Sequence, residues 1–213
     1  MERAWLGRVP YAEALERQRT RREAILAGEA EEALWALEHD PVITTGRREA
    51  GPLPDPTWLE AQGIALCKTE RGGLATWHGP GQLVVYALIN AGGRGLGPRG
   101  LVSALEDGVL GCLRDLGLSP TRRDGHPGVW VPSPTSPAGL DKICAVGLHF
   151  RRGVSMHGLA LNLDPDPWGF SLFTPCGITD AGVTSVARQL GSAPSPKEAS
   201  AALLEQLVSE LHH

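Results

Sequence analysis

The chain lacks the features that would tie it to a membrane, to export or to nucleic acid. No apolar run in its 213 residues approaches the roughly 18 that a membrane-spanning helix needs. The opening sequence MERAWLGRVPYAEALERQ carries charges where a signal peptide has an unbroken apolar stretch. A formal net charge of −4 gives no basic surface for general nucleic-acid binding. We therefore expect a cytoplasmic protein that binds neither a membrane nor a nucleic acid.

Cysteine is also scarce, and its spacing argues against two common uses. The four cysteines are scattered and include no CxxC pair: Cys67, Cys112, Cys144 and Cys176. Disulfides are rare in intracellular proteins, and zinc sites usually have closely paired ligands. The spacing therefore argues against a disulfide and against a zinc site with closely paired ligands.

Lysine is the scarcest basic residue. Of the 20 basic residues, only Lys68, Lys142 and Lys197 are lysine. Arginine keeps its proton in a protein, whereas a buried lysine can lose it. Because Lys142 opens a run of apolar strand residues, its amine could lie at the edge of the interior and act as a base or as a cationic partner. The competing interpretation is an ordinary lysine at a strand end, with its amine in water.

The rest of the chain mixes helical and strand patterns. Helical patterns cover residues 11–28, 101–117, 183–190 and a C-terminal segment that opens with the capping box SPKE. Strand patterns cover residues 41–45, 64–69, 83–90, 128–131, 142–150 and 157–163, with the last two forming a hairpin. GPLPDPT and PSPTSPAG are expected as surface loops. Helices and strands do not alternate strictly, so residues 1–213 are predicted to form one α+β domain.

A glycine-rich segment, ERGGLATWHGPGQLVVYALIN, precedes and includes one of these strands. Its glycines at positions 72, 73, 79 and 81 crowd a predicted loop around Arg71, Thr76 and His78. Glycine lets a backbone turn sharply and approach a ligand closely, although a simple hairpin would look similar. The segment is not a phosphate-binding loop of the GxxxxGK[ST] type, because no lysine follows.

One cysteine stands at a bend. In SLFTPCGIT, Cys176 lies between Pro175, which fixes one backbone angle, and Gly177, which frees the next. A cysteine nucleophile needs a cation, a base or a helix N-terminus to form its thiolate. The sequence offers three candidates: Lys142, His78 and His157. A Cys–Lys acyl transferase, a Cys–His hydrolase, a metal site and a non-catalytic binding module all stay open on this ground, with the metal site the weakest.

Five motifs in order carry a family resemblance: RGGLATWHGPGQLVVY, GVWV, KICAVGL, HGLALNL and FTPCGI. Together they resemble the octanoyltransferases of lipoate biosynthesis, also called the lipoate–protein ligase B family. The resemblance implies a single α+β domain with a mixed sheet flanked by helices, as in lipoate and biotin protein ligases. It also implies transfer of an octanoyl (or lipoyl) group from acyl carrier protein to a lysine of a lipoyl domain, the first step of endogenous protein lipoylation. No cofactor and no ATP are implied.

The resemblance also implies roles for residues. It places the acyl thioester on Cys176, with Lys142 lowering the pKa of that thiol. Substrate contacts are implied for three segments: Arg71, Gly72, Gly73, Leu74, Ala75, Thr76, Trp77 and His78; Cys144, Ala145 and Val146; His157, Gly158 and Leu159. Cys144 departs from the family pattern, since many relatives carry alanine there, which leaves open which thiol reacts first with an alkylating reagent.

The implied partners are octanoyl-acyl carrier protein, the lipoyl domains of 2-oxoacid dehydrogenases and the glycine cleavage H protein. Acyl carrier protein is acidic, so an arginine pair should dock it, and Arg47–Arg48 and Arg151–Arg152 are the candidates. The alternative function on the same fold is an ATP-dependent lipoate or biotin protein ligase. Such ligases activate the acid as an adenylate and need no cysteine nucleophile, so the PCG motif argues against it.

Overall fold

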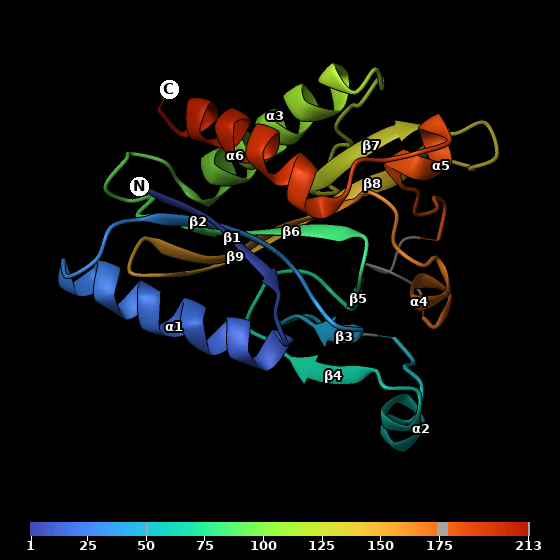
Figure 1. Cartoon of the computed structure of the whole chain (residues 1–213), viewed down its shortest axis with the longest axis horizontal. Coiled ribbons are helices and arrows are strands. Elements are labelled where there is room, and N and C mark those ends of the chain that lie inside the picture. The colour runs from blue at the N-terminus through green and yellow to red at the C-terminus, as the bar shows by residue number, and fades with distance from the viewer. Residues whose placement is uncertain (50, 174–178, 213) are drawn as a thin grey trace.

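A six-stranded mixed sheet organises the chain in the computed structural model, which describes residues 1–49, 51–173 and 179–212 (Figure 1). Its strand order is β1-β2-β6-β9-β8-β7. The strands are β1 (Glu2–Arg8), β2 (Ala33–Glu38), β6 (Gln82–Leu88), β7 (Gly128–Pro132), β8 (Leu140–Arg151) and β9 (Val154–Asn162). Only the β1–β2 pair is parallel among the described pairings of this sheet, so most of the sheet is built from antiparallel neighbours.

A smaller three-stranded sheet lies beside the large one (Figure 1). It has the order β4-β3-β5, with β3 (Val42–Thr45) at its centre. β4 (Ala65–Lys68) runs parallel to β3, and β5 (Thr76–His78) runs antiparallel to it. The glycine-rich loop connects β4 to β5, so the small sheet fixes both ends of that loop.

Two long helices cover one face of the large sheet and a third covers the other (Figure 1). α3 (Pro98–Asp115) and α6 (Pro196–His212) pack on each other and bury the main apolar core. Their close approach depends on Gly108, because a Cβ there would lie 2.7 Å from Leu207 Cδ2. α1 (Tyr11–Ala27) buries a second core on the opposite face. No helix of the described segments is long and apolar enough to cross a membrane.

Three short helices complete the fold: α2 (Pro56–Ala61), α4 (Trp168–Ser171) and α5 (Val186–Leu190). Leu59 of α2 joins Ile43, Ile64 and Trp77 in a small third core beneath the small sheet. Gly169 of α4 stands against the Trp77 ring, where a Cβ would come within 2.1 Å of a ring carbon.

Much of the predicted architecture is confirmed. The mixed α+β fold, α1, the β8–β9 hairpin and the C-terminal helix are all present. The capping box of α6 is formed as expected: the Ser195 backbone N–H donates to Glu198 Oε2 over 2.9 Å, and the Glu198 N–H donates to Ser195 Oγ over 3.3 Å.

Several expected elements differ from the structure. β1, β2 and α4 were not predicted, and Thr76–His78, expected in a loop, form β5. α2 begins inside the expected loop GPLPDPT, because the Asp55 carboxylate accepts the N–H groups of Thr57 and Trp58 and caps a helix with proline at its start. α3 begins at Pro98, ahead of the expected residue 101. α5 begins only at Val186, since Ser185 caps it and the residues before it bridge to β8.

Candidate active site

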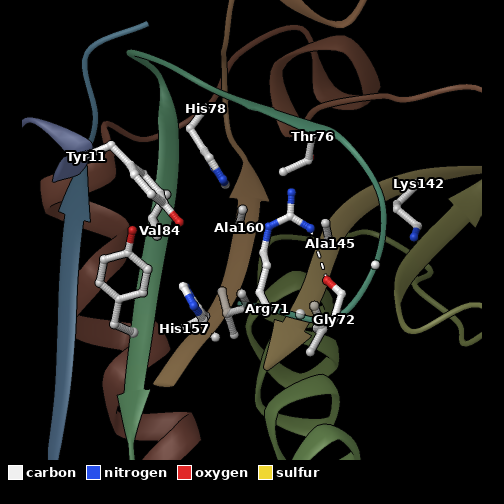
Figure 2. A pocket seen from close by; sticks show the side chains of 16 residues that line it. Tyr11, Arg71, Gly72, Thr76, His78, Val84, Lys142, Ala145, His157 and Ala160 are labelled. Atoms are coloured by element: carbon white, nitrogen blue, oxygen red, sulfur yellow. Dashed lines mark hydrogen bonds between the residues drawn. The ribbon is translucent and has the colours of Figure 1, made fainter. Parts of the chain in front are cut away.

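A cavity with about 520 Å³ of empty space lies between the large sheet and the glycine-rich loop (Figure 2). Its walls come from the start of α1, the loop and β5, and strands β6, β8 and β9. Tyr11 and Lys142 lie at opposite sides of the view, with Arg71 between them. We refer to this space as the first cavity.

Most of the site residues predicted from the sequence meet in the first cavity. Those that line it are Arg71, Gly72, Gly73, Thr76, His78, Lys142, Ala145, Val146, His157, Gly158 and Leu159. The alternation of β5 explains why Thr76 and His78 face the cavity while Trp77, between them, packs into the third core. Ala75 is also buried, and Leu74 is half-buried with its carbonyl accepting the N–H of Gly46.

The two predicted cysteines have different positions. Cys144 is fully buried in the main core rather than in the cavity wall, and burial raises the pKa of its thiol far above the usual range. The neighbouring Ala145 and Val146 line the first cavity instead. Cys176 lies in the segment 174–178, outside the residues that the structure describes.

A β-bulge aims Lys142 at the cavity. Val129 of β7 pairs with Cys144, but the next residue, Trp130, pairs with Lys142, so Ile143 is an extra residue in β8. In a regular strand Lys142 and Cys144 would share a face, and Cys144 faces the core. The bulge therefore turns the lysine to the face on which Ala145 lines the cavity.

Lys142 is held firmly once it is there. It is 7% exposed, its Nζ donates to Pro127 O over 3.0 Å, and the ammonium lies 4.8 Å from the centroid of the Trp130 ring. On its other side the backbone pairs with the chain that follows the segment 174–178. The Lys142 N–H donates to Gly182 O, and the Thr184 N–H donates to Lys142 O, both over 2.9 Å.

Arg71 is anchored to the small sheet. Its Nη2 donates to Thr44 O over 2.6 Å and to Thr44 Oγ1 over 2.8 Å, and its Nη1 donates to Gly72 O over 3.0 Å. The side chain is 7% exposed and its guanidinium points across the first cavity (Figure 2). A permanent positive charge is thereby fixed within the cavity, because arginine does not lose its proton.

His78 is held in one neutral tautomer. Its Nδ1–H donates to Gln82 Oε1 over 2.7 Å, and Gln82 Nε2 in turn donates to Trp77 O and to Asn162 Oδ1. Nε2 is therefore unprotonated and accepts from the Thr44 hydroxyl over 3.4 Å. Burial lowers the pKa of His78 to about 3, so the ring is uncharged at neutral pH.

His157 is the most strained residue of the site. Its φ of 61° is in the left-handed region, although it belongs to β9, and its N–H donates to Gln18 Oε1 over 2.8 Å instead of to β6. The ring is 2% exposed, and neither ring nitrogen has a hydrogen-bond partner among the described residues. Such strain and unsatisfied polar atoms gather at functional sites.

Aromatic residues that the sequence did not single out complete the wall opposite Lys142. Tyr11 stacks on His78 with 5.9 Å between ring centroids, and Tyr86 meets the edge of His157. His39 Nδ1–H donates to Val9 O, so its Nε2 accepts the hydroxyl hydrogen of Tyr86 over 2.6 Å. Tyr86 stands in the quoted motif GQLVVY, but nothing local signals Tyr11, which comes from the start of α1.

The lining of the first cavity is mostly apolar and contains two basic side chains. Arg71 and Lys142 are the charged residues of its described lining, and no carboxylate faces them there. Within the described segments, no three side chains of the types that bind metals gather at one point. The arrangement suits a neutral, mostly apolar substrate that develops negative charge during reaction.

Comparisons with known proteins identify the family of the chain. The model of the lipoyl protein ligase A/B catalytic domain matches residues 10–208. The octanoyltransferase of Cereibacter sphaeroides is 43% identical over 204 residues, covering 93% of this chain and 91% of the relative. That of Chloroflexus aurantiacus is 41% identical over 207 residues, covering 95% and 90%.

Solved structures share the fold at lower identity. A bipartite lipoate protein ligase from Thermoplasma acidophilum has a TM-score of 0.71 at 19% identity, covering 99% of this chain and 84% of that one. Biotin protein ligase from Aquifex aeolicus has a TM-score of 0.56 at 14% identity, covering 99% and 70%. The family match and the identity to curated relatives together decide the assignment: the chain belongs to the octanoyltransferases of the lipoyl protein ligase A/B family.

Proposed function

We propose that this acyltransferase moves an octanoyl group from acyl carrier protein to a lysine of a lipoyl domain through a thioester on Cys176. Octanoyl transfer in protein lipoylation follows from family membership. The proposed donor is octanoyl-acyl carrier protein, and the proposed acceptors are the lipoyl domains of 2-oxoacid dehydrogenases and the glycine cleavage H protein. A cytoplasmic location is part of the same proposal, and cell fractionation would test it.

The position of Lys142 is the observation that most supports the covalent route. A buried lysine stands in the wall of an apolar cavity, and its backbone pairs with the chain just after the segment that contains Cys176. A cation close to a thiol favours the thiolate, which is the form that attacks a thioester. We therefore assign Lys142 to the activation of Cys176.

The reaction has two balanced steps. The Cys176 thiolate attacks the octanoyl carbonyl, the bond to the carrier sulfur breaks, and the carrier leaves as its thiol after taking a proton from the Lys142 ammonium, which becomes the free amine. The acceptor lysine, as the free amine, then attacks the new thioester, an amide bond forms, and the Cys176 thiolate leaves. The proton lost by the amine passes to a base, a role that we assign to Lys142. Because amide formation from a thioester is downhill, the reaction needs no ATP.

The first cavity suits the octanoyl chain. Its floor is made of small or aliphatic side chains: Val84, Ala145, Val146, Leu159 and Ala160. Burying six methylene groups there would contribute about 5 kcal/mol at about 0.8 kcal/mol each. Gly158 also lines this cavity, and the close approach of the β6 backbone leaves no room for a Cβ at this position. The substrate contacts expected of His157 and the Arg71–His78 loop belong to the same proposal.

Purified components test the proposal. Octanoyl-acyl carrier protein and an unmodified lipoyl domain are mixed with the enzyme in the absence of ATP, and the mass of the lipoyl domain is followed. We expect the mass of one octanoyl group to be added to one lysine. Product that appears only with ATP and free octanoic acid would contradict the proposal and indicate the ligase activity, which the octanoyltransferase relatives do not favour.

A further inference from the structure

A second, larger cavity meets the first one at Lys142. It contains about 1160 Å³ of empty space and opens to solvent. Lys142 and the pairs Gly72–Gly73 and Val146–Gly147 line both cavities. The two spaces are therefore separated by the glycine-rich loop and share the wall in which the proposed chemistry takes place.

The second cavity has a charged rim of one sign. Its ionisable lining consists of Arg47, Arg48, Lys142, His126 and His149, and no carboxylate belongs to its described lining. Arg47 and Arg48 are exposed, and neither forms an ion pair within the described part of the chain. Two adjacent arginines at a concave surface suit an oxyanion, such as a phosphate or a carboxylate.

The backbone that carries these arginines is fixed to the glycine-rich loop. The Arg47 N–H donates to Arg71 O over 3.0 Å, and the Arg48 N–H donates to Gly73 O over 3.3 Å. Gly46 allows this contact, since a Cβ there would lie 2.4 Å from Gly73 O. The arginine pair thus has a set position relative to the loop that covers the first cavity.

We infer that the second cavity binds the phosphopantetheine arm of the acyl donor, with Arg47 and Arg48 on its phosphodiester and on the acidic carrier behind it. The inference rests on the proposed function. The thioester would lie at Lys142, where the two cavities meet, with the octanoyl chain in the first cavity and the arm in the second. The phosphate is separated from the thioester by the pantetheine unit, which suits a groove that runs outward from the lysine.

The chemistry of the two substrates favours the donor over the acceptor in this groove. The acceptor presents a lysine side chain, which is cationic until it loses its proton, and a rim of arginine would repel it. The donor presents a phosphodiester with a permanent negative charge. The acceptor would then enter the site from another side.

The other candidate pair is less suitable. Arg151 forms an ion pair with Glu23 of α1 over 2.9 Å, and Arg151 and Arg152 lie at the end of the β8–β9 hairpin. Likewise Arg122 pairs with Glu106 and Asp107, and Arg123 with Asp180. Arg47–Arg48 is the arginine pair that lines the groove ending at Lys142.

Reactions with three different acyl donors distinguish the possible roles of Arg47 and Arg48. Octanoyl-acyl carrier protein, octanoyl-phosphopantetheine and octanoyl-pantetheine are each reacted with wild-type enzyme, with Arg47→Ala/Arg48→Ala and with the control variant Arg151→Ala/Arg152→Ala. The rate of acyl-enzyme formation is measured by intact mass over a range of donor concentrations, and transfer to the acceptor is measured separately. Thermal unfolding checks that each variant is folded.

We expect Arg47→Ala/Arg48→Ala to lower kcat/KM about tenfold or more for the two donors that carry phosphate, through a loss of two charge-assisted hydrogen bonds. The rate with octanoyl-pantetheine and the acceptor step should stay within about twofold of wild type. An equal loss with all three donors, a loss confined to the acceptor step, or a larger loss in the control variant would overturn the inference. A wild-type enzyme that forms no adduct from any donor would instead contradict the proposed function.

Discussion

Three features of the fold fix the position of the Lys142 ammonium: a β-bulge, a carbonyl oxygen and an aromatic ring. The sequence predicts a lysine at the edge of an apolar strand, and the structure adds the bulge at Ile143 that turns it toward the cavity. Its ammonium donates to Pro127 O and lies over the Trp130 ring, so the space around it is fitted to a slender side chain. The contacts therefore fix where the Lys142 Nζ lies, so a substitution that only keeps the positive charge does not reproduce this site.

We predict that Lys142→Arg loses about a hundredfold or more in kcat/KM, although it keeps the positive charge. The guanidinium is wider than the ammonium and cannot act as a base. Lys142→Met should lose at least as much, and steady-state kinetics together with thermal unfolding would separate lost chemistry from lost folding. Wild-type rates in Lys142→Arg would mean that a cation alone suffices.

The thiols can be ranked by their surroundings. Cys144 and Cys112 are buried, and burial raises the pKa of Cys112 to about 11, while Cys67 is half-buried. We predict that iodoacetamide labels Cys176 first in the native protein and leaves Cys144 unlabelled until the chain is unfolded. Peptide mass mapping over time would measure this order. Labelling of Cys144 at the rate of Cys176 would contradict the ranking.

Some residues of the site carried no local signal. Thr44 anchors Arg71, but it stands in an ordinary apolar strand, and its role depends on a contact between residues 27 positions apart. Gln82 was within a quoted motif, yet only the folded chain reveals that it fixes the tautomer of His78. Such residues act through long-range contacts, which a single sequence does not specify.

At the scale of elements, the close packing of β6 against β9 requires glycine at position 158. Gly158 lies opposite Tyr86 in the β6–β9 pairing, and a Cβ at this position would approach Val85 O to 2.1 Å. The neighbouring His157 already has left-handed backbone geometry. Both features leave this part of β9 with little tolerance for change.

We predict that Gly158→Ala lowers the free energy of unfolding by about 1–3 kcal/mol, because the collision is with backbone rather than with a mobile side chain. Gly51→Ala is the matched control, since a Cβ there would have no neighbour within 4 Å. Urea unfolding would measure both. An equal effect of the two substitutions would show that the close approach of β6 and β9 does not limit this position.

Helices whose sequence pattern is contained in one short stretch could be predicted from the sequence. The capping box of α6 and the apolar stripe of α3 are contained in short stretches, and both helices are present. β1 was missed because ERAWLGR alternates only weakly and contains three charges. β2, ALWALE, fits a helix as well as a strand, and its pairing with β1 and β6 decides the outcome.

On the scale of the whole molecule, three buried histidines make stability depend on pH. Burial lowers the pKa of His39 to about 4, and those of His78 and His157 to about 3, from an ordinary 6.5. Between these values the unfolded chain binds protons that the native protein does not. The native state is therefore stabilised above about pH 6.5 and loses that contribution as the pH falls.

We predict that the free energy of unfolding decreases from pH 7.5 to pH 5.5. Below its unfolded pKa, each of the three histidines lowers the free energy of unfolding by up to about 1.4 kcal/mol for each pH unit. The carboxylates whose pKa is lowered, such as Glu198 and Asp180, titrate below this window. Urea unfolding at three pH values would measure the slope, and equal stability across the window would contradict it. A single cooperative transition in the same data would also support the prediction that residues 1–213 form one domain.

The covalent intermediate on Cys176 is the central claim, and one measurement tests it most directly. Wild-type enzyme and the Cys176→Ser variant are each mixed with octanoyl-acyl carrier protein, without ATP or acceptor, and their intact masses are recorded. We predict one octanoyl adduct on the wild type, removed by hydroxylamine, and none on a folded Cys176→Ser protein. An unmodified wild type, or near-normal turnover by Cys176→Ser, would contradict covalent catalysis at this residue.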